Sequence, residues 1–142
     1  MSLSDYYENK ILDHLVGNAS FTMLTTMYIA LSTATIDDTT TGTTIVEPVG
    51  NGYACKQMTA NPTLTLPNCW GAAAAGSITT IAVQTFPENT AGGNWGTITD
   101  FALVDAATLG NILAYGTLTS PQAVVVGDTL QFNIGAITVI LA

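Results

Sequence analysis

TITDFALVDAATLGNILAYGTL, residues 97–118, contains two strand-like runs on either side of a short loop. The runs TITDFALVD (97–105) and NILAYGTL (111–118) are rich in the β-branched and aromatic residues that favour strands. The loop AATLG (106–110) has the length of a hairpin connection and ends on a glycine. This stretch therefore predicts two antiparallel strands joined by a hairpin.

Further strand-like runs lie on both sides of this hairpin. Each is rich in Thr, Ile, Val, Tyr or Phe and is bounded by turn-forming residues. Many short strands at modest spacing predict a mainly β fold, a single antiparallel β-sandwich or jelly-roll-like domain. The runs are MYIALST (27–33), YACKQM (53–58), SITTIAVQTF (77–86), TLQFNI (129–134) and ITVILA (137–142), the last two hinged at Gly135.

One segment near the start of the chain, residues 4–16, has a helical pattern instead. Ser4 or Asp5 can cap its first turn, and the spacing of Asp5 and Glu8 predicts a capping box. Gly17 follows the segment and ends it, because glycine readily adopts the left-handed conformation found after helices.

The expected helix carries an apolar stripe. Tyr7, Ile11 and Leu15 recur every four residues and therefore lie on one side of a helix. We expect this stripe to pack against the rest of the chain or to attach it to a neighbouring molecule, which makes these three residues candidate interface positions.

The length of 142 residues fits one domain, 1–142, with the helix in 1–17 and the sandwich in 27–142. Two segments resist assignment to a strand and are expected to be exposed loops. Residues 35–46 are rich in threonine, and residues 60–76 contain two prolines and a Gly-Ala run. No repeat of fixed period and no change in composition marks a second domain.

The threonine-rich segment 35–46 is predicted to be an exposed loop, or an arm that becomes ordered only on a neighbouring molecule. Thr39, Thr40 and Thr41 lie at its centre and are candidate interface residues. Loops of this kind supply adaptable contact surface in many assemblies.

Aromatic residues offer a second kind of candidate surface, a carbohydrate-binding face. The candidates are Trp70, Trp95, Tyr53 and Tyr115. Trp95 stands in Asn-Trp-Gly just before a strand, where an aromatic ring often closes the end of a sandwich, so a core position is favoured for it. Trp70 lies within 60–76, and we keep an exposed or interfacial position and a core position open for it.

Charge limits the possible partners. The chain has two basic residues, Lys10 and Lys56, against ten acidic ones, and a net charge of −8. Binding to phosphate backbones needs several Lys or Arg, so nucleic acid and anionic membranes are excluded as partners. No apolar stretch approaches the roughly 20 residues of a membrane span, and the acidic N-terminus does not resemble a signal peptide.

Only 8% of the residues are charged, whereas about 25% is typical of a soluble domain. The surface must consist largely of neutral polar residues or be covered by other subunits. Both possibilities suit a component of a larger particle better than a cytosolic enzyme.

The two cysteines, Cys55 and Cys69, can be free thiols or a disulfide. Free thiols are favoured for a protein that folds in a reducing cytosol. The sequence offers no further ligands at the ordered spacing that a metal site with these cysteines needs.

The residue types of enzyme sites are scarce. His14 is the single histidine, and Asp13 points about 100° away from it on a helix, so this pair does not form a catalytic unit. His14 is expected to border the packing face of the helix. No nucleophile, phosphate-binding or dinucleotide motif is present, so we expect no enzymatic activity and no cofactor.

A calcium site is the remaining chemical possibility. It would use Asp37, Asp38 or Asp100, but their spacing does not match the calcium-binding loop pattern. Solvated loop carboxylates are the favoured interpretation of Asp37 and Asp38, so no metal is expected.

Three motifs are specific enough to compare with known families: DHLVG (13–17), EPVGNGY (47–53) and WGTITDFALVDA (95–106). With these motifs, and with likeness that runs nearly end to end, the chain resembles a family of small tailed-phage virion proteins. Members of this family are labelled tail-fibre-like or capsid-associated. Residues 60–76 depart from the family's pattern.

The resemblance implies a structural protein of the virion, assembled in the bacterial cytoplasm, with no catalytic residues. We expect a capsid decoration (cement) protein that clamps neighbouring copies of the major capsid protein, because the chain lacks the heptads and long repeats of a fibre shaft. The alternative is a tail or tail-fibre component, with receptor or carbohydrate binding. We expect a homo-oligomer, a trimer, because closed symmetry is the usual outcome of self-association.

Overall fold

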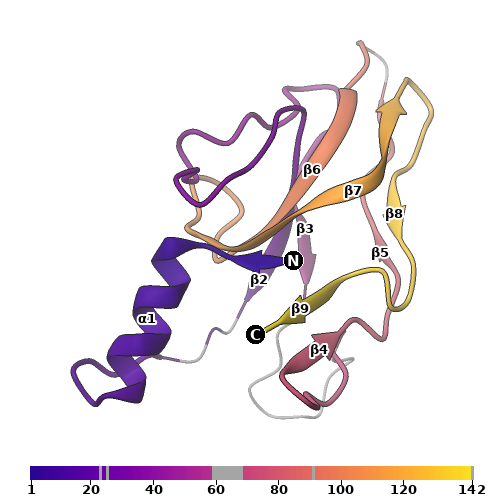
Figure 1. Cartoon of the computed structure of the whole chain (residues 1–142). Helices are drawn as coiled ribbons and strands as arrows, with labels where there is room; N and C mark the ends of the chain where they lie inside the picture. The colour runs from indigo at the N-terminus through magenta and orange to yellow at the C-terminus, as the bar shows by residue number, and fades with distance from the viewer. Residues whose placement is uncertain (23, 25, 59–68, 91, 142) are drawn as a thin grey trace.

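The protein is described by a computed structural model over residues 1–22, 24, 26–58, 69–90 and 92–141 (Figure 1). It is mainly β, with antiparallel sheets and one helix, which confirms the predicted fold class. In the described part of the chain, no helix is long and apolar enough to cross a membrane. The elements are β1 Ser2–Leu3, α1 Asp5–Leu15, β2 Met27–Ser32, β3 Lys56–Met58, β4 Ser77–Thr79, β5 Gln84–Thr85, β6 Gly96–Val104, β7 Ile112–Val124, β8 Gln131–Phe132 and β9 Thr138–Ile140.

The main sheet has five strands in the order β1-β7-β6-β2-β3. Its centre is the predicted hairpin of β6 and β7, in which Phe101 pairs with Gly116 and Ala102 with Tyr115. Strand β7 continues to Val124, beyond the predicted run, because its second half pairs with the start of β6 after a register shift. The sheet also contains β1, a strand of two residues that precedes the helix. The sequence did not predict this strand.

Two smaller sheets, β4–β9 and β5–β8, lie on one side of the main sheet (Figure 1). The run 77–86 was predicted to be one strand and instead forms β4 and β5. Its partner strands are separated by the turn at Gly135, whose N–H donates to the carbonyl of Thr80 at 2.8 Å. Because the partners are divided by this turn, the run itself divides.

Side chains of the main sheet alternate between its two faces, as the pleat of a strand requires. Ile29, Leu31, Phe101 and Leu103 belong to the larger core, which the two small sheets cover. Their neighbours Ala30, Ala102 and Val104 belong to a second, smaller core on the opposite face, together with Ile36 and Ile112. Both faces of the main sheet are therefore buried.

The helix α1 begins at Ser4, whose side chain accepts a hydrogen bond from the N–H of Tyr7 at 3.3 Å. The predicted capping box of Asp5 and Glu8 is wrong, because Asp5 is the first residue inside the helix and Ser4 is the cap. The helix ends at Leu15, and Gly17 adopts the expected left-handed conformation with φ 74°.

The apolar stripe of α1 is buried at one end only. Tyr7 and Ile11 are half-buried and pack against the larger core, with the Tyr7 ring edge-on to Phe21 at 5.4 Å between centroids. Leu15 is 76% exposed, because α1 leaves the sheet as it runs toward its C-terminus (Figure 1). For Leu15, attachment to a neighbouring molecule stays a prediction.

Candidate functional site

The threonine-rich segment folds against the main sheet. The N–H of Thr33 donates to the carbonyl of Val46 at 3.0 Å and closes the segment at its base. Ile36 is 4% exposed and anchors the segment in the smaller core. In the structure this segment is a loop that packs on the main sheet, and ordering on a neighbouring molecule stays a prediction.

Within this loop, Asp37 organises the first turn. Its Oδ1 accepts from the N–H of Thr39 at 3.0 Å and from the hydroxyls of Thr39 and Thr40 at 2.8 and 3.0 Å. These hydrogen bonds favour the carboxylate and hold the pKa of Asp37 below its usual value. Side-chain bonds to nearby backbone are the reason why Asp and Thr favour turns.

A close backbone contact fixes the other end of the loop. Gly42 lies so near the hairpin loop that a Cβ atom on it would come within 2.0 Å of the carbonyl oxygen of Gly110. The hairpin loop is itself closed by Asp105, whose carboxylate accepts from the backbone and side-chain N–H groups of Asn111 at 2.7 and 2.8 Å. Two glycine-containing loops thus pack directly on each other.

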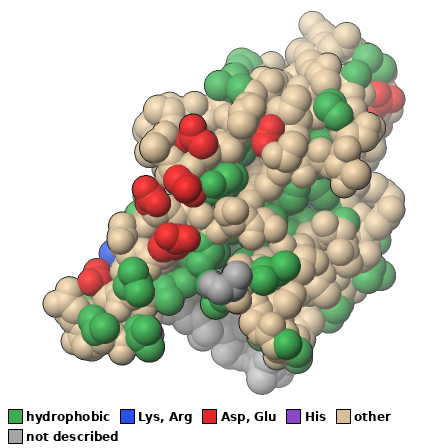
Figure 2. Space-filling model, in the orientation of Figure 1, with side chains coloured by type: hydrophobic (Ala, Val, Ile, Leu, Met, Phe, Trp, Pro, Cys, Tyr) green, Lys and Arg blue, Asp and Glu red, His purple; other side chains and the backbone are tan. Residues whose placement is uncertain are grey.

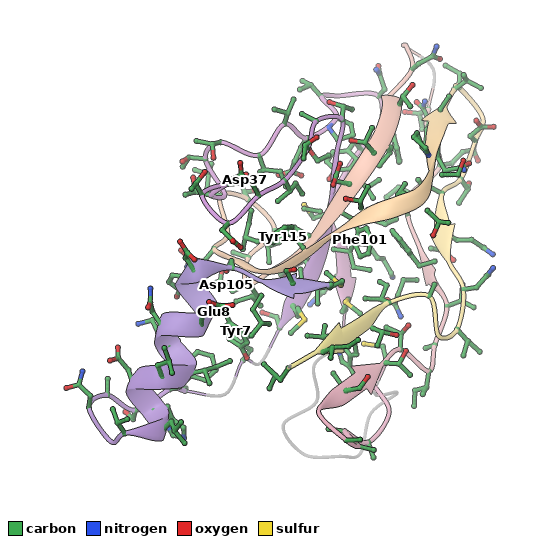
Figure 3. The ribbon with its side chains drawn as sticks, in the orientation of Figure 1. Tyr7, Glu8, Asp37, Phe101, Asp105 and Tyr115 are labelled. Carbon is green, nitrogen blue, oxygen red and sulfur yellow. The ribbon has the colours of Figure 1, made fainter. Side chains whose placement is uncertain are left out.

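One side-chain bond ties the loop to β7. The hydroxyl of Tyr115 donates to Oδ1 of Asp38 at 2.6 Å, and this bond, with the negative charge of Asp38, raises the pKa of Tyr115 to about 12. Figure 3 shows Tyr115 on β7 beside the loop that carries Asp37.

The first turn of α1 is fixed to the same strand. The hydroxyl of Ser4 donates to the carbonyl of Ile112, and the N–H of Ser4 donates to the carbonyl of Leu113 at 3.1 Å. Asp5 and Tyr6 follow, and both are exposed.

Together these three segments enclose a recess of about 390 Å³, which we call the threonine recess. That volume lies within the roughly 300–1,000 Å³ of typical small-molecule sites. Acidic side chains gather on the molecule over α1 and the loop beside it (Figure 2). The recess is lined by Ser4, Asp5, Tyr6, Asp38, Thr39, Thr40, Thr41, Gly42, Asn111 and Ile112.

The predicted interface residues form two groups, since Tyr7 and Trp70 line one apolar pocket away from the threonine recess. Thr39, Thr40 and Thr41 all line the threonine recess. Trp70 is 9% exposed and belongs to the larger core, so the exposed position kept open for it is wrong. The sequence analysis did not identify Asp5, Tyr6 and Asn111 as site residues. In the sequence, Gly42 and Gly110 were the available indication that two loops meet here, because glycines permit the close backbone contact that the structure has.

The predicted aromatic face does not form as a surface. Trp95 is 3% exposed, as expected of a core residue, and its indole N–H donates to the carbonyl of Asn51 at 3.0 Å. The Tyr53 ring lies edge-on to it, 5.3 Å between centroids. Of the four candidate aromatics, Tyr115 alone lies at the threonine recess, through its bond to Asp38.

A second recess, also about 390 Å³, surrounds the EPVGNGY motif. Oε2 of Glu47 accepts from the hydroxyl of Tyr53 at 2.7 Å and from the thiol of Cys55 at 3.1 Å. Burial and the carboxylate of Glu47 raise the pKa of Cys55 to about 12, so its thiol stays protonated. The Tyr53 hydroxyl also accepts from the N–H of Leu31 at 2.9 Å, so the cluster fastens the motif to β2. Cys55 is a free thiol.

The residues considered for metal or catalytic chemistry stay apart. Asp100 is buried in β6, where Oδ1 accepts from the Thr117 hydroxyl at 2.8 Å, while Asp37 and Asp38 lie in the loop. The described residues contain no group of three side chains suited to holding a metal. His14 is exposed, and its Nδ1 accepts at 3.2 Å from the N–H of Phe21, whose ring packs edge-on against Tyr7.

Residues 2–140 match the model of a family described as podophage GP4 fiber I protein gp80. No curated protein matches the chain. The match confirms the resemblance to a tailed-phage virion protein and places the chain among virion components. It supports the fibre alternative, whereas the capsid-decoration prediction gains no support from it.

Proposed function

Because the chain belongs to the podophage GP4 fiber I protein family, we propose that it is a fibre subunit whose threonine recess binds a neutral saccharide of the host surface. Its role is structural attachment to other virion proteins combined with ligand binding, without catalysis. The observation that carries the proposal is the recess itself, assembled from three segments that are far apart in the sequence.

The chemistry of the lining selects the ligand class. Asp5, Asp38 and the threonine hydroxyls offer oxygen acceptors, and the hydroxyls of Thr39 and Thr40 already donate to Asp37. A ligand with many hydroxyl donors complements such a surface. Tyr6 adds an aromatic ring, and rings of this kind pack against the C–H faces of sugars.

Other ligand classes fit less well. No Lys, Arg or His of the described residues lines the recess, and the nearest printed cation, Lys10, has its Nζ over the Tyr6 ring at 5.8 Å, so an anionic group would meet two carboxylates directly. A metal ion finds no suitable ligand group among the described residues.

The recess is also organised before any ligand arrives. The bonds from Tyr115 to Asp38 and from Ser4 to Ile112 hold its walls, and the contact of Gly42 with Gly110 holds its rim. A binding site that is already ordered loses less conformational entropy when its ligand binds.

The test is NMR titration of the isotope-labelled protein with an array of neutral bacterial oligosaccharides. We expect chemical-shift changes at Tyr6, Thr41 and Asn111, and their loss in Asp5→Ala. Glu8→Ala is the matched control, because Glu8 lies in the same first turn and does not line the recess. Equal binding by Asp5→Ala and the control, or shifts that avoid the recess, would reject the proposal.

A further inference from the structure

Two long segments of the chain carry no charge. No Asp, Glu, Lys, Arg or His occurs from Gln57 to Pro87, and none occurs after Asp128. The fold brings the two segments together, since β4 pairs with β9 and β5 with β8. The described residues 69–86 and 129–141 therefore form one layer without a charged side chain, which we call the charge-free layer.

The inner side of this layer is part of the larger core. Ile78 and Val139 face each other across the β4–β9 pair and pack against that core. Phe132 and Ile137 belong to the same core. The layer is therefore a fixed part of the fold.

The outer side exposes neutral side chains. The pairs next to Ile78 and Val139, Ser77 with Ile140 and Thr79 with Thr138, point the other way because the strands are pleated. Figure 2 shows no acidic or basic side chain on the surface over β4 and β9. Large apolar side chains are exposed in this layer at Ile81, Val83, Ile134, Ile140 and Leu141.

Such a surface is unusual for an isolated subunit. Interface cores are depleted in charged residues, and the described residues of this layer contain no charged side chain. The net charge of −8 makes two copies of the chain repel each other wherever their acidic surfaces meet. Two copies that meet through the charge-free layers avoid placing acidic side chains opposite each other.

We infer that the charge-free layer is the surface through which copies of this chain pack against one another in the fibre. A second copy is the occupant that fits, because a basic partner would be drawn to the acidic surface over α1 and the loop 35–46 instead. We expect a closed trimer, since closed symmetry is the usual outcome for identical subunits.

The test introduces one carboxylate inside the charge-free layer in one variant and outside it in another. Light scattering then measures the mass of the assemblies that the full chain forms in solution. Ile134→Asp puts it on the charge-free layer, at a side chain that is 65% exposed in a turn closed by the backbone bond from Ala136 to Asn133. Val49→Asp is the matched control, at a side chain that is 88% exposed outside the layer. We expect at least a tenfold weaker association for Ile134→Asp and unchanged association for the control.

A second, more conservative pair of variants keeps the test valid if Ile134→Asp misfolds. Gln131→Glu and Gln122→Glu make the same chemical change at exposed strand positions, in β8 within the layer and in β7 outside it. We expect weaker association for Gln131→Glu alone. A monomeric wild-type chain at high concentration, or equal association of all four variants, would overturn the inference. Saccharide-induced chemical-shift changes at Tyr6 in Ile134→Asp test ligand binding independently of self-association. Failure of the saccharide proposal is therefore distinguishable from failure of the packing proposal.

Discussion

The charge-free layer and the threonine recess use the same small set of neutral residues in opposite ways. The layer packs Phe132 and Ile137 into the larger core and exposes neutral side chains on its other side, among them Ile134. The loop of the recess buries mainly Ile36 and directs its hydroxyls and carboxylates outward. Two of the ten acidic residues, Asp5 and Asp38, line the recess, whereas the described residues of the layer contain none.

The two regions also differ in what holds them in place. Aromatic contacts hold the layer, with the rings of Phe101 and Phe132 at 4.8 Å and those of Phe86 and Phe132 at 6.3 Å between centroids. The loop depends on polar bonds around Asp37 and Asp38 and on one glycine contact. Apolar burial contributes more per residue than an exposed hydrogen bond, so damage to the layer should cost more.

The largest effect is expected for Phe132→Ala. This ring is 7% exposed and joins the small sheets to the main sheet, so its removal should lower the free energy of unfolding by about 3–5 kcal/mol. Chemical denaturation measures this change. A loss below about 1 kcal/mol would mean that the layer packs only loosely on the sheet.

An intermediate effect is expected for Gly42→Ala. The added methyl group would overlap the carbonyl of Gly110, so we expect about 1–3 kcal/mol of destabilisation together with displacement of the loop. Hydrogen exchange should increase at residues 37–45 and remain slow in β6 and β7.

Gly71→Ala provides the comparison in the charge-free layer. A Cβ atom there would meet a methyl group of Ile81 at 3.2 Å, and that side chain can yield. Its stability and exchange should stay close to those of the wild type. An equal loss of stability in Gly42→Ala and Gly71→Ala would show that the close contact of Gly42 has no special role in holding the recess.

The smallest effect is expected for Tyr115→Phe, which removes the hydroxyl bonded to Asp38. The bond is largely exposed, so we expect a loss of about 0.5 kcal/mol in the free energy of unfolding near neutral pH. The folded-state pKa of about 12 is above the ordinary 10.0, so this contribution is complete below pH 10 and disappears as pH rises through 12. Denaturation of both proteins from pH 8 to 12 measures it, and a difference that grew with pH would contradict the assignment.

Local features of the fold were predictable from the sequence. The hairpin of β6 and β7, the helix end before Gly17 and the hinge at Gly135 all depend on residues close together in the chain. Their signals are turn chemistry and periodicity, which operate over a few residues.

Features that depend on distant pairing were not predictable. The pairing of the run 77–86 with the C-terminal strands divides that run and buries Trp70, and no local pattern records either result. Strand β1 has two residues, too few for any periodicity. The threonine recess forms where the start of α1 and the start of β7 lie beside one loop. Single residues such as Thr39 could therefore be identified from the sequence, but their assembly into one site could not.

The most direct test of this segregation of charge is the salt dependence of self-association, measured by light scattering on the wild-type chain between about 0.02 and 0.5 M NaCl, where screening changes strongly. Association through the charge-free layer predicts an assembly that persists or tightens as salt rises, because salt weakens only the repulsion between copies of net charge −8. Dissociation of the assembly with rising salt would mean that ion pairs join the copies, and would contradict the account.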